Sequence, residues 1–435
     1  MKNRDGDTGK IKNWMDMEEL SEELMEDDEG TVEQEKEEEV LLREPKSKKK
    51  LALLGIVLLC ALVLGGFLLS DTFYGIIRRQ SNYTLTPSGT EVEYSKEAAS
   101  SFAVLGDLVL RLGQEGIAAL DSSGKVVWDV PFTMTSPNMV TCGDYVAVAD
   151  RKGTKIILCD KNGLQSEMTA EYPITLHTVN EAGYIAVAVG QDMQNGVALY
   201  SNTGELIVKR STTVSGDGVP MAIALNEDAT KMVTSYLVFS GESMKSQVTV
   251  FDFSNAADGV TDRILANYSY DATMVVTLAF IQGSCVFVGD NRIGAISMEG
   301  NTKEAWSQEL LYTIKALAVG EDFFALAYDG GQAGTAQAEP EYDLVLFDKS
   351  GVTILQLQIG DITYLDVSNG ILVYGQERSY KAISKDGTSQ WYYDAPEDTY
   401  RLLNLAGGDT VTAVVSGKMK MMSIVGVEET GDSVS

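Results

Sequence analysis

The stretch Leu120-Asp121-Ser122-Ser123-Gly124-Lys125-Val126-Val127-Trp128 joins two apolar runs through a short polar turn that closes on glycine. Weaker copies of this turn close on seven further glycines: Gly89, Gly163, Gly204, Gly259, Gly300, Gly351 and Gly387. Successive copies lie 35, 39, 41, 55, 41, 51 and 36 residues apart. A period of about 40 residues with strand-like rather than helical patterning is typical of a β-propeller built from four-stranded blades.

The runs around these turns predict four antiparallel strands in each repeat. In the clearest repeat they are residues 101–105, 107–112, 116–120 and 125–130. The next repeat has the same order, with strands at residues 139–142, 145–150, 155–159 and 165–169. Eight turn glycines predict an all-β fold of eight blades. Seven blades is the alternative, because the repeat around Gly259 is long and poorly patterned.

The two ends of the repeat region complement each other. Residues 91–94 follow the turn Pro87-Ser88-Gly89 as a strand without the other three strands of a blade. At the other end, the strand-like runs at 400–405, 410–415 and 418–424 lack a fourth strand. Pairing the two ends would close the ring and remove its exposed edges. We therefore expect one propeller over residues 84–425.

Residues 51–70 form an uncharged apolar stretch of 20 residues, the length that crosses a bilayer as a helix. A lysine cluster at 46–50 precedes it, so the positive-inside rule keeps the N-terminus in the cytoplasm. Fifty residues stand before the span and no Ala-x-Ala site follows it, which favours an uncleaved signal anchor. We expect a single-pass plasma-membrane protein, with residues 71–83 as a linker and the propeller outside. Residues 426–435 are expected to be disordered.

Residues 1–45 are strongly acidic and are expected to form a mostly disordered cytoplasmic tail. One short amphipathic helix is predicted at 14–25, with an apolar stripe of Trp14, Met17, Leu20 and Leu24. A helix this short is marginal alone in water, so it would form on a cytoplasmic protein partner. The alternative is a solvated acidic tail with accidental spacing.

Composition argues against several classes of function. The net charge of −29 opposes binding to nucleic acid or to an anionic membrane surface. One of the four cysteines lies in the apolar span, and an odd, sparse set remains: Cys142, Cys159 and Cys285. Such a set does not resemble a disulfide framework, and we expect three buried thiols that serve as small apolar residues.

No catalytic, cofactor-binding or metal-ligating set stands out. The chain lacks a Gly-x-Ser-x-Gly elbow, a P-loop and a Gly-x-Gly-x-x-Gly turn. His177, the single histidine, cannot by itself make a metal site and is expected to be buried and hydrogen-bonded. Carboxylates are plentiful, but only their spatial separation would identify a catalytic pair.

Two insertions point to a binding surface. Residues 236–244 and 329–342 lengthen the connection between the second and third strands of two repeats. These connections all emerge on one face of a propeller, where ring proteins usually bind. Tyr236, Phe239 and Tyr342 are predicted to be exposed anchors for a ligand, since aromatic residues dominate binding hot spots. The alternative is tolerated loop growth.

The segments 119–128 and 384–391, each with a Trp after the turn, resemble the repeat of quinoprotein-like (PQQ-like) propellers, and the propeller is also WD40-like. In that family the Trp docks between neighbouring blades, which implies this role for Trp128, Trp391 and the degraded copy at Trp306. The whole layout resembles membrane-anchored propeller proteins of unknown function from Gram-positive anaerobes. Most such propellers bind partners and hold no cofactor.

The sequence therefore favours a membrane-tethered, extracytoplasmic propeller that binds a protein or cell-wall ligand without catalysis. The alternative is an extracytoplasmic enzyme, either a quinoprotein-like oxidoreductase or a glycan-active enzyme, with acidic residues in the central channel.

Overall fold

The computed structural model describes residues 83–95, 99–254, 263–300, 302–329 and 340–427. The chain divides into two units, and every described residue belongs to the second unit, Gly65–Ser435. The predicted cytoplasmic helix, lysine cluster and apolar span all lie outside the described residues. Within the described ranges there is no helix long and apolar enough to span a membrane.

The first half of the described chain contributes 17 strands. They are β1 (Tyr83–Glu93), β2 (Ala99–Leu105), β3 (Leu108–Gly113), β4 (Gly116–Leu120), β5 (Val126–Pro131), β6 (Pro137–Cys142), β7 (Tyr145–Asp150), β8 (Lys155–Asp160), β9 (Gly163–Thr169), β10 (Ile174–Val179), β11 (Ile185–Gln191), β12 (Gln194–Tyr200), β13 (Leu206–Thr213), β14 (Val219–Leu225), β15 (Lys231–Ser240), β16 (Ser243–Asp252) and β17 (Ile264–Asp271).

The second half contributes 15 further strands. They are β18 (Val275–Ile281), β19 (Ser284–Gly289), β20 (Arg292–Ser297), β21 (Lys303–Glu309), β22 (Ile314–Val319), β23 (Phe324–Tyr328), β24 (Leu344–Phe347), β25 (Thr353–Leu357), β26 (Tyr364–Ser368), β27 (Ile371–Gln376), β28 (Ser379–Ile383), β29 (Ser389–Asp394), β30 (Thr399–Asn404), β31 (Thr410–Val415) and β32 (Lys418–Gly426).

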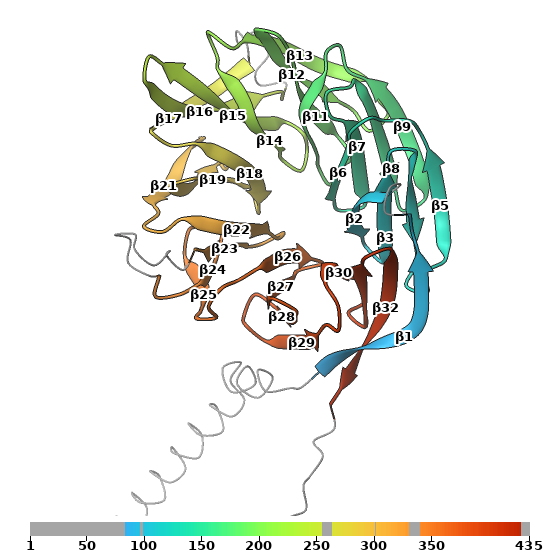
Figure 1. The fold of residues 1–435 in the computed structure, drawn as a ribbon. Coiled ribbons are helices and arrows are strands. Elements are labelled where there is room, and N and C mark those ends of the chain that lie inside the picture. The colour runs from blue at the N-terminus through green and yellow to red at the C-terminus, as the bar shows by residue number, and fades with distance from the viewer. Residues whose placement is uncertain (1–82, 96–98, 255–262, 301, 330–339, 428–435) are drawn as a thin grey trace, which may run out of the picture. The chain divides into compact units, whose positions relative to one another are not determined.

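These strands form an all-β propeller of four-stranded antiparallel groups, which confirms that part of the predicted fold (Figure 1). Each of six sheets contains four consecutive strands, from β2–β5 round to β22–β25. A seventh sheet has eight strands in the order β26-β27-β28-β29-β1-β32-β31-β30, so it divides into two groups of four. The ring has seven or eight blades according to whether this sheet is counted once or twice. Each group of four strands is called a blade below.

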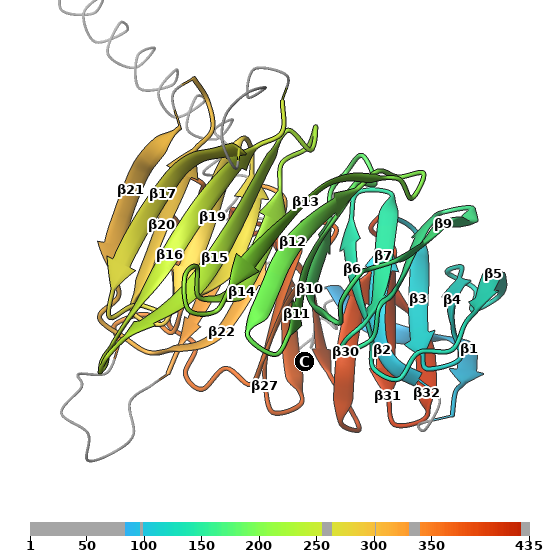
Figure 2. The same ribbon diagram turned by 90° about the horizontal axis from the view of Figure 1, so that it is seen from above.

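The first strand of each blade is the innermost one. In most neighbouring blades the first strands contact each other, as β2 does with β6 and with β30. Figure 2 shows the strands of one blade, β14 to β17, lying side by side across the thickness of the ring. Alternate residues of a blade are buried against the two neighbouring blades. Leu110 packs toward the blade β6–β9, and Val109 packs toward the closing blade (β30, β31, β32 and β1).

The two ends of the described chain pair with each other, as the sequence predicts. Strand β1 runs antiparallel to β32, with Tyr83 opposite Gly426 and Glu93 opposite Lys418. One parallel pair, Thr84 with Tyr392, joins β1 to β29, and the Thr84 hydroxyl donates to the Tyr392 carbonyl. The ring is thus closed by strands more than 300 positions apart in the sequence, because Thr84 and Tyr392 are separated by 308.

The turn predicted at Gly89 is part of a continuous strand. Gly89 was predicted to close a hairpin that precedes a strand, but residues 83–93 form one continuous strand. The register shifts between Pro87 and Glu91, so Gly89, at φ +93°, lies in a β-bulge. The reason is that β32, the antiparallel neighbour of β1, comes from the other end of the chain, so no hairpin is needed at this position.

The turn around Gly124 shows why these sequences recur. The Asp121 carboxylate accepts hydrogen bonds from the backbone N–H of Ser123 at 2.9 Å and of Lys125 at 3.0 Å. The hydrogen bond from the Ser123 hydroxyl is the main cause that lowers the pKa of Asp121. Gly124 has a φ of +82°, and a Cβ there would lie 2.6 Å from a Val92 methyl carbon of β1. The turn therefore needs both a short polar acceptor and a glycine.

Candidate functional site

Two faces of the ring carry different connections. The loop face is where the second and third strands of a blade join, for example at 113–116, 240–243 and 415–418. The hairpin face is the opposite one, where the first and second strands join and the third and fourth strands join, for example at 105–108 and 120–126. Glu93, the last residue of β1, pairs with Lys418 at the loop face, so Tyr83 begins β1 at the hairpin face.

The longest hairpin of the described chain projects at the loop face. Strands β15 and β16 each have 10 residues, and they stay paired up to Ser240 and Ser243. Phe239 lies one residue before this last pair, and its side chain is 64% exposed. The residues 236–244, expected to be a loop, are thus mostly strand, and the connection itself is Gly241 and Glu242.

Tyr236 is not an exposed anchor, and that prediction is wrong. Its side chain is only 1% exposed. Met232 on the same strand packs between the blades β10–β13 and β14–β17. Tyr236 shares that face, because residues two and four apart on a strand point the same way. Sequence reasoning missed this because it ended the strand before Tyr236.

A polar cluster surrounds Tyr236 between these two blades. Arg210 forms a 3.3 Å ion pair with Asp217, and its guanidinium lies 5.2 Å from the ring centroid of Phe251. The other Asp217 oxygen accepts a 3.0 Å hydrogen bond from the backbone N–H of Thr213. This cluster holds the connection between β13 and β14 against the base of the long hairpin. Burial raises the pKa of Tyr236, and an interaction with the Thr234 hydroxyl partly opposes that shift. Neither hydroxyl makes a well-formed hydrogen bond to a described residue.

Tyr342 lies two blades away from Phe239. It is half-buried and packs against the apolar cluster shared by the blades β18–β21 and β22–β25. The remainder of its insertion, 330–339, lies outside the described residues. The structure therefore does not bring the three predicted anchors together, and only Phe239 is well exposed.

The tryptophans lie at blade boundaries. Trp128 donates a 3.1 Å hydrogen bond to the Lys161 carbonyl in the next blade. Trp306 donates a 2.8 Å bond to the Lys349 carbonyl in the same way. Trp391 is 1% exposed and donates a 3.0 Å bond to the Asn404 side-chain oxygen on β30. Each indole thus links its own blade to the following one.

The single histidine and the three described cysteines are buried or half-buried. His177 is 8% exposed, its Nε2 lies 3.3 Å from the Ala147 carbonyl, and burial lowers its pKa to about 4. Cys159 and Cys285 are buried and Cys142 is half-buried, and burial raises the pKa of each thiol. Over the described ranges no three His, Cys, Asp or Glu side chains come together to hold a metal ion.

The innermost strands carry paired charges. Asp366 on β26 accepts a 2.8 Å hydrogen bond from Arg401 on β30, and the Tyr364 hydroxyl lies 3.3 Å from the same carboxylate. Lys315 on β22 pairs with Asp361. Both ion pairs join residues of neighbouring blades, so the charge of Asp366 is neutralised across a blade boundary.

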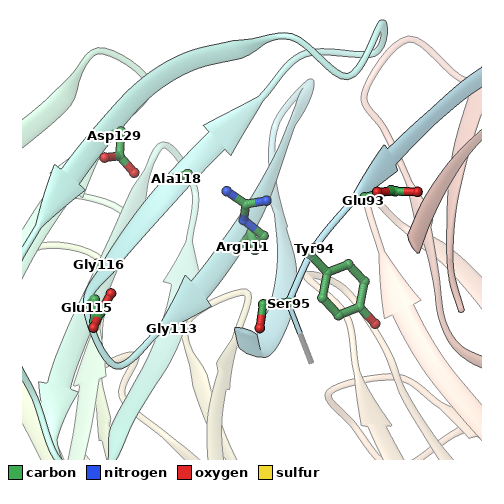
Figure 3. Close-up of a pocket in the computed structure, with 9 residues that line it drawn as sticks. All are labelled: Glu93, Tyr94, Ser95, Arg111, Gly113, Glu115, Gly116, Ala118 and Asp129. Atoms are coloured by element: carbon green, nitrogen blue, oxygen red, sulfur yellow. The ribbon is translucent and has the colours of Figure 1, made fainter. Parts of the chain in front are cut away.

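A cavity of about 360 Å³ opens where the closing blade meets the blade β2–β5 (Figure 3). Glu93, Tyr94 and Ser95 line it from the end of β1 and the chain just after it. Opposite them, β3, β4, β5 and the 113–116 hairpin contribute six more residues: Arg111, Gly113, Glu115, Gly116, Ala118 and Asp129. The signal for this cavity in the sequence is Arg111, a cation inside the apolar run 107–112. The sequence analysis did not predict it as a site residue.

Comparison with known proteins gives a family and a set of distant folds. A model described as a family of unknown function (DUF5711) matches residues 78–424. No curated protein matches the sequence. Similar solved structures include BamB from Moraxella catarrhalis, with 12% identity and a TM-score of 0.46 over 78% of this chain and 100% of that one.

Two further solved structures are similar at the same level. Apo AztD from Citrobacter koseri has 10% identity and a TM-score of 0.45, over 68% of this chain and 86% of that one. The WD40 domain of Pan2 from Neurospora crassa has 8% identity and a TM-score of 0.43, over 79% of this chain and 95% of that one. Likeness at this level carries no information about ligand or activity.

Proposed function

Since this chain belongs to DUF5711, a family of unknown function, we propose that it is a membrane-tethered, extracytoplasmic propeller that binds a protein or cell-envelope ligand. Binding takes place on the loop face and involves no catalysis. We count the ring as eight-bladed, because the eight-stranded sheet consists of two complete groups of four strands.

The observation that carries the proposal is the exposure of Phe239. A large aromatic side chain that is 64% exposed near the tip of a paired hairpin gains free energy when a partner covers it. The hairpin is held rigid by its own pairing and by the Arg210–Asp217 cluster at its base. A rigid support lowers the entropy cost of binding.

The position of Tyr83 supports binding on the loop face. Twelve residues separate the apolar segment 51–70 from Tyr83. Strand β1 begins at Tyr83 and β32 ends at Gly426, and both residues lie at the hairpin face. The tether therefore joins the ring at the hairpin face, and the loop face carries neither end of the ring's chain.

Position-specific cross-linking tests the binding surface. Benzoylphenylalanine would replace Phe239 in the full-length protein in its own cells, and Val352 would be the control. Val352 is 59% exposed and follows the Gly351 turn on the hairpin face. We expect a discrete adduct at position 239 that is absent at 352. No adduct at 239, or the same adduct at both positions, would contradict the proposal.

Protease treatment of intact cells tests the location. The proposal expects digestion of the propeller from outside, while a tag placed before residue 14 stays protected. Protection of the propeller until the membrane is permeabilised would reverse the proposed topology.

The predicted helix at 14–25 is proposed to bind a cytoplasmic protein through Trp14, Met17, Leu20 and Leu24. Replacing all four by Ser would remove the apolar stripe while keeping the acidic charge. Loss of a tail-dependent complex in this variant, with retention in a variant that changes four acidic residues of the opposite face to Gln, is the expected result. Equal loss in both variants would indicate a purely electrostatic contact.

The enzyme alternative has weaker support. It requires free carboxylates in the central channel, and Asp366 is instead held by Arg401. Purified protein incubated with calcium and pyrroloquinoline quinone provides a direct test. A bound chromophore that survives desalting would favour the enzyme over the binding module.

A further inference from the structure

The cavity beside β1 is a product of ring closure. On the face of the blade β2–β5 that points to the closing blade, Val109, Ala118 and Leu120 belong to the shared apolar cluster. Nearer the loop face, β1 ends at Glu93 and no longer covers this surface. The Tyr94 hydroxyl donates a 2.7 Å hydrogen bond to the Val415 carbonyl, which fixes this wall of the cavity.

Among the described residues, Arg111 is a half-buried cation that forms no ion pair. Its side chain lines the cavity, and no carboxylate of the described residues lies within ion-pair distance of it. A guanidinium cannot shed its proton, so it remains charged in this position. Its planar donor set matches a carboxylate, which it can bind with two parallel hydrogen bonds.

The other charged residues of the cavity are acidic. Glu115 and Asp129 line it, and neither forms an ion pair with another described residue. Val92 and Tyr94 pack toward the blade β2–β5, so the Glu93 side chain between them points to the other face of β1, away from Arg111. Together with Arg111 these two carboxylates give the cavity a net charge of −1. A simple anion is repelled by such a lining, whereas a ligand with ammonium groups is attracted.

Strand register separates the opposite charges. Arg111 on β3 lies opposite Ala118 on β4, and Ala118 lies opposite Asp129 on β5. Two strand spacings amount to about 10 Å between the Cα atoms of Arg111 and Asp129. The small side chain of Ala118 and two glycines of the hairpin, Gly113 and Gly116, leave the space between the charges open (Figure 3).

We propose that this cavity binds a ligand of the amino-acid class, with its carboxylate on Arg111 and its ammonium groups near Glu115 and Asp129. The ligand is either a free basic amino acid or the C-terminal residue of a peptide. This inference rests on the proposed function, because it gives the chemistry of a ligand on the loop face. It uses residues far from Phe239 in the sequence, so the two can fail separately.

Calorimetry with the purified full-length protein tests the charges one at a time. L-Lysine is the probe, lysinamide lacks its carboxylate, and diacetyl-lysine lacks both ammonium groups. Lysinamide and diacetyl-lysine are each expected to bind about tenfold or more weakly than lysine, since each lacks a charged group that makes a charge-assisted contact. Inorganic phosphate is expected not to bind. Alanyl-lysine identifies the source: equal affinity assigns a peptide end, and loss of binding assigns the free amino acid.

Two variants connect the binding to named residues. Arg111→Gln should reduce the affinity for lysine to that for lysinamide and leave lysinamide itself unchanged. Asp129→Asn, at an exposed position that should not affect folding, should weaken lysine and lysinamide alike. Arg378→Gln, an exposed arginine of the blade β26–β29, is the matched control and should bind as the wild type does.

The inference is overturned if lysine does not bind at millimolar concentration, if lysinamide or phosphate binds as tightly as lysine, or if Arg111→Gln matches the wild type. Failure here together with a retained cross-link at Phe239 leaves the proposed function standing. If lysine binds but no cross-link forms at position 239, the inference about the cavity stands and the proposed role of the hairpin is contradicted. The cavity then binds its ligand independently of the hairpin.

Discussion

The indole of Trp306 donates a 2.8 Å hydrogen bond to the backbone carbonyl of Lys349, across the boundary between two blades. The ring also covers Gly351, two residues further on, so tightly that a Cβ there would lie 2.8 Å from indole atoms. The turn of one blade is therefore shaped to fit the tryptophan of the blade before it.

Gly351→Ala should destabilise the ring more than Gly300→Ala. Both glycines have positive φ, +77° and +68°, so each alanine costs about 1–2 kcal/mol of backbone strain. Only the alanine at 351 also collides with Trp306, which adds about 1–3 kcal/mol, since no atom lies within 4 Å of a Cβ at 300. Urea denaturation of both variants measures the difference. Equal losses would show that the indole moves away freely.

Tyr236→Phe should stabilise the protein. The hydroxyl is buried and makes no well-formed hydrogen bond to a described residue, so removing it recovers a desolvation cost of about 1 kcal/mol. Tyr94→Phe is the matched control, because that hydroxyl donates a 2.7 Å bond to Val415. The free energy of unfolding of the Tyr94→Phe control should fall by about 1 kcal/mol. Similar losses in both variants would reveal a buried water bound to Tyr236.

Acid should weaken the fold through His177. Burial, with a smaller contribution from the charge of Arg151, lowers its pKa from the ordinary 6.5 to about 4. The unfolded chain therefore takes up a proton between pH 6.5 and 4 that the folded chain refuses, so stability falls as pH falls through that window. The loss at pH 5 is about 2 kcal/mol.

The chain has one histidine, so His177→Gln should flatten the stability curve between pH 7 and 5.5. Urea denaturation across that range measures the curve. An unchanged slope in the variant would assign the pH dependence to carboxylates instead.

Leu85→Ala should cost as much as any core truncation, although Leu85 is near the start of the described chain. Its side chain is 4% exposed and packs in a cluster with Trp391 and Met422. The expected loss is about 2–5 kcal/mol. Val425→Ala, on the same strand pair but 44% exposed, should change stability by less than about 0.5 kcal/mol. Comparable effects would mean that β1 frays from the ring.

The strands of the ring could be predicted because their signals are local. Alternating apolar residues and a glycine turn specify a hairpin within ten residues, as at 116–120, where the predicted and observed strands coincide. The closure between β1 and β32 followed from two incomplete repeats. The buried histidine followed from its place in an apolar strand, and Nε2 does lie near a backbone carbonyl.

The site could be predicted only in part. Phe239 is exposed as expected, but Tyr236 is buried, because the second strand of that blade continues to Ser240. Strand length depends on what the neighbouring blade covers, and a single sequence does not contain that information.

The sequence by itself determined the repeat and the strand order, since both depend on residues close together along the chain. It also indicated the pairing of the chain ends, because each end carries an incomplete repeat. Only the tertiary structure decided which side chains face each other between blades. Tyr94 and Arg111 line one cavity because β1 joins the sheet that contains β32, a strand more than 300 residues away. Such a meeting is a property of ring closure, and no local pattern encodes it.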